Sequence, residues 1–76
     1  MSTKREEVRD PKSCLNKAAD DEPLFVLRAS DLLAPPLIDV WAILAGGAGC
    51  APEKVNEARA LAQKMRDWAG TKKVPD

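Results

Sequence analysis

The clearest hydrophobic pattern of this 76-residue chain lies near its C-terminus, where apolar residues recur at spacings of three and four. This is the period of a helix with one buried face. Pro52 suits a first helical position and Gly70 suits a helix end, so we expect a helix over roughly 52–70. Its expected inner face comprises Val55, Ala58, Ala62, Met65 and Ala69, flanked by Leu61 and Trp68.

A second helix is predicted from about 35 to 46, preceded by a capping turn at Ser30 or Asp31. Its two initial prolines fit only within a first turn, and two glycines at 46–47 favour a left-handed stop. The expected apolar face is Leu37, Val40, Trp41 and Leu44. Small alanines allow the two helices to approach closely, so residues 35–69 predict a helical hairpin.

The N-terminal half is patterned more weakly. We expect residues 1–9 to form a flexible arm and residues 10–76 to form a single small domain. A short helix is predicted from residue 10, with Asp10 as its cap and Pro11 at its first position.

Residues 22–30 can be read as a strand, or as a helix with Pro23 in its first turn. Extended structure is favoured because the signals of the next helix begin soon afterwards and because Pro23 ends the preceding helix. A lone strand cannot satisfy its own backbone groups, and no second strand-like run follows. We therefore expect this segment to pair with another copy or to pack between helices, and either outcome favours a homo-oligomer. The fold class is mainly α: a short N-terminal helix, an extended segment and a C-terminal helical hairpin.

Composition narrows the function classes. The chain carries 12 basic and 12 acidic residues, and this balance argues against binding to a nucleic-acid polymer. It has no histidine and no glycine-rich phosphate loop between a strand and a helix. We therefore expect a protein that is not an enzyme and has no cofactor or metal.

Two further features bear on the compartment. Residues 32–51 are long enough for a membrane span, but Asp39 and the prolines and glycines interrupt them, so we expect none. No signal-peptide pattern opens the chain, and Cys14 and Cys50 lack metal-ligand spacing. A cytoplasmic protein with two free thiols is predicted, and a Cys14–Cys50 disulfide is the alternative.

Several side chains are candidates for binding. Arg28 ends an apolar run, so we expect it to be at least half buried and to need a partner. That partner is Asp31 or Asp39 of the same chain, an acid of a neighbouring copy, or an external anion. The candidate ligand-binding residues are Arg28, Asn16, Lys17, Asp31, Trp41 and Lys72.

Other candidates point to a protein interface. Three consecutive acids at 20–22 form either a solvated junction or an anionic contact surface. The candidate interface residues are Asp20, Asp21, Glu22, Phe25 and Trp68. The plainer interpretation of the two tryptophans is core packing, that of Lys72 and Lys73 is contact with the negative end of the last helix, and that of Cys14 is burial.

The stretches "SCLNKAADDEPLFVLRASDLLAP", "LIDVWA", "EARALAQKMRDW" and "KKVPD" resemble a group of small phage and prophage proteins of unassigned function. The shared pattern is EPxFVLRAxD, then AP, then W. This chain departs from it in having Pro36 beside Pro35 and in its glycine-rich hairpin loop. Neither departure touches the residues whose match makes the resemblance specific, which are Asn16, Asp20, Glu22, Pro23, Arg28 and Asp31.

The resemblance implies a phage-type inhibitor of host defence and assigns no binding residues to this chain. Two hypotheses follow. The first is a non-catalytic homo-oligomer that sequesters a small anionic nucleotide signal, such as a cyclic dinucleotide. The second is a protein-binding inhibitor or adaptor that blocks a host defence protein through a surface patch.

Overall fold

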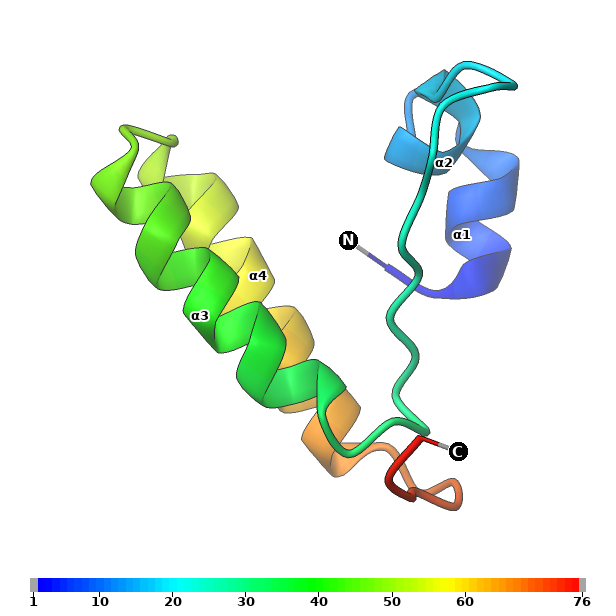
Figure 1. Ribbon diagram of the computed structural model, residues 1–76, viewed down its shortest axis with the longest axis vertical. Coiled ribbons are helices and arrows are strands. Elements are labelled where there is room, and N and C mark those ends of the chain that lie inside the picture. The colour runs from blue at the N-terminus through cyan, green and yellow to red at the C-terminus, as the bar shows by residue number, and fades with distance from the viewer. Residues whose placement is uncertain (1, 76) are drawn as a thin grey trace.

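The computed structural model describes residues 2–75 and shows two separate pairs of helices joined by an extended segment (Figure 1). The N-terminal pair consists of α1 (Lys4–Arg9) and α2 (Cys14–Lys17). The C-terminal pair consists of α3 (Ala34–Gly47) and α4 (Pro52–Asp67), which lie antiparallel. The predicted mainly α fold with a C-terminal helical hairpin is confirmed. No helix within residues 2–75 is long and apolar enough to cross a membrane.

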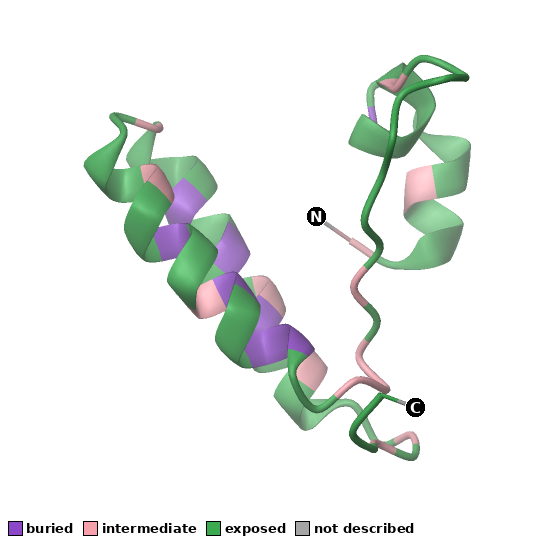
Figure 2. Cartoon of the chain, viewed as in Figure 1, coloured by how far each residue is buried: buried purple, intermediate pink, exposed green. Residues whose placement is uncertain are grey.

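The hairpin is held together by a narrow seam of small side chains (Figure 2). Ile38 and Ala42 of α3 pack against Val55, Ala58 and Ala62 of α4, and the three alanines are fully buried. Alanine side chains let two helix backbones approach closely, as the sequence predicted for α4. Leu61 and Met65, also predicted, pack partly buried at the edge of the seam.

The predicted inner face of α3 is wrong. Leu37, Val40, Trp41 and Leu44 are all exposed, and the buried side of α3 carries Ala34, Ile38 and Ala42 instead. Nearly every position of α3 is apolar, so periodicity alone does not separate its two sides. The close approach that the alanines of α4 require selects the side of α3 with small residues.

The starts of the two hairpin helices agree with the prediction from the sequence, and the end of α3 does not. Both helices carry a proline in the first turn, and the Asp31 carboxylate accepts a hydrogen bond from the Leu33 amide at 2.7 Å, just before α3 begins. The left-handed residue of the turn is Gly49, at φ 87°, and the predicted stop at 46–47 is wrong. The first two glycines continue α3, and the chain reverses one residue past its cap.

The N-terminal pair is organised by polar groups. Ser13, and not Asp10, caps α2, and it also donates to the Glu7 carbonyl at 2.6 Å. The Asn16 amide reaches three carbonyl oxygens at 2.9–3.0 Å, those of Glu7, Val8 and Asp10 at the end of α1. Residues 4–9, where the sequence favoured a flexible arm, are helical here. Their flexibility in solution stays a prediction.

Residues 22–28 run extended from α2 toward the start of α3, as predicted. Leu27 alone in this run packs against the hairpin core. Past it, the tail returns to the chain: Leu32 donates to the Lys73 carbonyl at 3.0 Å, and Lys73 donates to the Ser30 carbonyl at 2.9 Å. These two bonds tie the C-terminal tail to the loop before α3.

Candidate functional site

The six predicted ligand-binding residues do not form one site. Asn16 is used inside the N-terminal pair, and Lys17 is exposed on α2. Trp41 lies on α3, and the Lys72 ammonium donates to the Arg66 carbonyl in the last turn of α4. That contact is the helix-end role predicted for Lys72. No metal-binding group of histidine, cysteine or acidic side chains occurs within residues 2–75.

The expected burial of Arg28 is wrong, and so are its expected partners in the same chain. The side chain is exposed, and its guanidinium makes no hydrogen bond or ion pair with any residue from 2 to 75. The Asp31 carboxylate is taken by the Leu33 amide, and Asp39 pairs with Arg66 of α4. Both acids already have partners at the hairpin, so the Arg28 guanidinium is left to bind a group outside the described chain.

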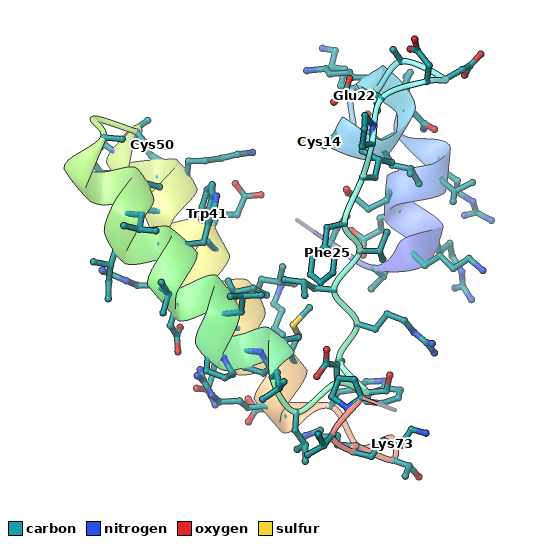
Figure 3. The ribbon with its side chains drawn as sticks, viewed as in Figure 1. Cys14, Glu22, Phe25, Trp41, Cys50 and Lys73 are labelled. Atoms are coloured by element: carbon teal, nitrogen blue, oxygen red, sulfur yellow. The ribbon has the colours of Figure 1, made fainter. Side chains whose placement is uncertain are left out.

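Cys14 and Cys50 are free thiols on separate helix pairs (Figure 3). Cys14 is exposed, so its predicted burial is wrong. Trp68 is half exposed just past α4, and its indole lies over Gly70, where an added Cβ would meet ring atoms at 1.9–2.3 Å. A side chain at position 70 would push this half-exposed ring aside. The helix end predicted at Gly70 falls instead at Asp67.

The three acids stand at the far end of the extended segment. Glu22 closes a turn, with its amide bonded to the Ala19 carbonyl and its carboxylate accepting from the Ala19 amide at 3.2 Å. Asp20 and Asp21 are exposed. This is the solvated junction that the sequence offered as one interpretation.

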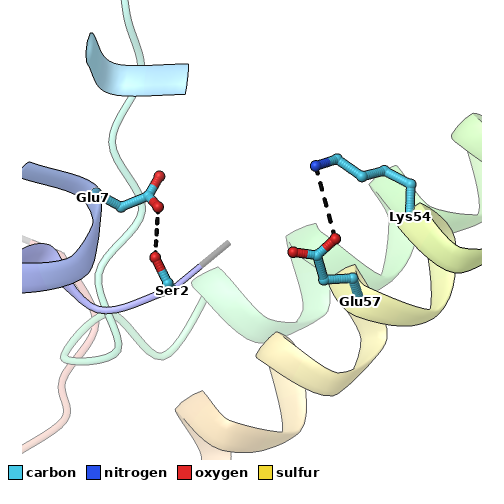
Figure 4. A network of polar contacts seen from close by, with 4 residues as sticks. All are labelled: Ser2, Glu7, Lys54 and Glu57. Carbon is cyan, nitrogen blue, oxygen red and sulfur yellow. Dashed lines mark hydrogen bonds and ion pairs between the residues drawn. The ribbon is translucent and has the colours of Figure 1, made fainter. Parts of the chain in front are cut away.

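Other polar contacts lie on the surface, away from the candidate residues. Figure 4 shows Ser2 donating to Glu7 at 2.5 Å and, on α4, Lys54 paired with Glu57 at 3.7 Å. An open hollow on α1 is lined by Lys4, Arg5, Val8 and Arg9, and it includes none of the candidate residues. Exposed pairs of this kind contribute little to stability and define no site.

The strongest candidate site is the extended run at 23–28, which we call the binding segment. Leu24, Phe25 and Val26 are 54%, 81% and 70% exposed, and Figure 3 shows Phe25 projecting from the segment. Residues 23–27 neither donate nor accept a hydrogen bond within the described chain. Exposed apolar side chains on a backbone with no hydrogen-bond partners mark a surface that another molecule can complete.

Comparison with known proteins finds no relative of this chain. No family model matches the chain, and neither a curated protein nor a solved structure is detectably similar to it. The site therefore rests on the geometry of the chain itself.

Proposed function

We propose that this protein is a non-catalytic, protein-binding module that engages its partner through the binding segment. The observation that carries the proposal is that the rest of the described chain leaves the backbone groups and the exposed side chains of this segment unused. Its backbone from 23 to 27 makes no hydrogen bond with any residue from 2 to 75, and the side chains of Leu24, Phe25 and Val26 are exposed. Extended backbone with unmet donors and acceptors suits strand addition, in which such a segment pairs with the edge of a partner's sheet.

The side chains of the segment supply specificity for such a pairing. In an extended run, successive side chains point to opposite sides, so Leu24 and Val26 share one side and Phe25 lies on the other. Phe25 is the most exposed of the three and is suited to fill an apolar pocket. The acids before the segment and Arg28 after it provide charged groups at the rim of the contact.

The resemblance to small phage proteins makes a host defence protein the proposed class of partner. The exposed binding segment supports a protein partner independently of that resemblance. A small inhibitor that adds a strand to its target needs no catalytic group.

The test is capture of a specific partner by the full chain, compared across variants of the segment. Phe25→Ala removes the exposed ring, and Val26→Pro removes a backbone N–H that is unused in the free protein. We expect each variant to weaken partner binding at least tenfold, a loss of about 1.4 kcal/mol. Neither should change the melting temperature, because neither group is packed or bonded.

The matched control is Val74→Ala, which removes a similarly exposed apolar side chain from the tail. It should bind the partner as the wild type does. Capture that is unchanged by both Phe25→Ala and Val26→Pro would show that the partner binds elsewhere, and the proposal would fail.

A second candidate function is supported by Arg28. Its guanidinium is exposed and unpaired within residues 2–75, so it can bind an anion such as a nucleotide phosphate held between copies of the chain. Thermal shift with a panel of cyclic dinucleotides tests this version. Stabilisation that is lost in Arg28→Ala would favour it over protein binding, and no shift with any ligand would remove it.

A further inference from the structure

The exposed side of α3 carries a continuous apolar surface that the hairpin does not use. We call it the α3 stripe. Its members follow spacings of four, three, one and three, so they lie along one side of the helix. They are Leu33, Leu37, Val40, Trp41 and Leu44, each between 44% and 67% exposed.

The α3 stripe stays exposed in the hairpin, and the core between α3 and α4 is small. Among the described residues no large side chain is fully buried, and the seam consists mostly of alanines. The chain exposes 6059 Å² of surface. A folded monomer of 8.2 kDa exposes roughly 4,500 Å². Standard interfaces bury about 800 Å² on each partner. The excess is larger than this, and the exposed α3 stripe contributes part of it beside the extended segment and the N-terminal pair.

We propose that the α3 stripe is an interface with a second copy of this chain. Two hairpins pack α3 against α3 about a two-fold axis, and the two α4 helices flank this central pair. A spacing of three and four is the pattern that packed helix pairs use. The inference goes beyond the proposed function, because the stripe and the binding segment are different surfaces and each can be right without the other.

The chemistry of the stripe favours an identical partner. A two-fold interface brings the same patch of both copies together, so the patch must not repel itself. The stripe carries no charged side chain, and the single acid of α3, Asp39, is paired with Arg66 of α4. Two such stripes can therefore meet without burying an unpaired charge.

The first test is the mass of the full chain in solution, measured by sedimentation equilibrium under reducing conditions over a wide concentration range. We expect twice the chain mass. Leu44→Glu places a charge on the stripe and should weaken association at least tenfold. Ile43→Glu is the matched control, because Ile43 is equally exposed on the same helix but lies about 60° around it from the stripe. It should leave the mass unchanged.

A second measurement does not depend on a destabilising charge. In a Cys14→Ser, Cys50→Ala background, Leu37→Cys lies near the middle of the stripe, where a two-fold axis brings a residue close to its own copy. Oxidation should link the Leu37→Cys chains much faster than Ile43→Cys chains. Equal linking rates would overturn the proposal. A wild-type chain that stays single at every concentration, or binds lipid vesicles as a single chain, would overturn it too.

Discussion

Replacement of Ala58 by aspartate is expected to unfold the helical hairpin. Ala58 is fully buried where α4 meets α3, and no cation lies in the apolar seam to pair with a new carboxylate. An unpaired buried charge costs several kcal/mol. A domain of this size has only about 5 kcal/mol of stability in total. The variant should therefore lose most of its helical circular dichroism.

Ala60→Asp is the matched control for this prediction. It introduces the same residue one half-turn away on the same helix, at an exposed position. Its cost should be limited to helix propensity, about 0.7 kcal/mol, with a cooperative melting curve retained. If Ala58→Asp melts like Ala60→Asp, α3 and α4 do not pack through the alanine seam, and the described hairpin is wrong.

Ile38→Ala should cause the second largest loss of folding stability. Ile38 is the largest buried side chain in the seam on α3, with 7% of its surface exposed. Truncating a buried isoleucine costs about 2–5 kcal/mol, through lost transfer energy and the cavity left behind. We expect the midpoint of urea unfolding to fall sharply. The slope of the unfolding free energy against urea concentration should stay the same if the unfolded state is unaltered.

Ile43→Ala removes the same atoms from the same helix at a position that is 65% exposed. Its effect should stay within about 0.5 kcal/mol of the wild type. Equal losses for the two variants would show that Ile43 is as buried as Ile38, and that the sides of α3 are assigned incorrectly.

These two helices also show what the sequence could and could not predict. Pro52, the alanines of α4 and the prolines of α3 carry enough local information to place both helices within a few residues. The side of α3 that is buried is a tertiary property. Leu37 and Leu44 satisfy helical periodicity as well as Ala34 and Ala42 do, and only the close approach of α4 separates them.

The N-terminal half was less predictable because polar side chains, rather than apolar ones, organise it. Asn16 was a candidate ligand-binding residue, and its position nine residues after Glu7 gave no sign that it would bond to the end of α1. Its side-chain nitrogen donates to three carbonyls within the N-terminal pair, and its role in ligand binding stays a prediction. A hydrophobic pattern does not predict contacts of this kind.

Arg28 was expected to be buried because it follows an apolar run. That argument assumed that the run itself is buried, and Leu24, Phe25 and Val26 are exposed instead. Extended structure was predicted correctly from Pro23 and from the early start of the next helix. The absence of hydrogen-bond partners for residues 23–27 within the described chain makes this stretch the candidate site.

The most direct test of the central claim is amide hydrogen exchange in the free protein, read residue by residue by NMR. Amides within the helices α3 and α4 should be protected, and those of residues 24–27 should exchange near the rate of an unstructured peptide. Fast exchange there means that the backbone of the binding segment is available to a partner. Strong protection of residues 24–27 would show that the segment is already paired, and would contradict the account.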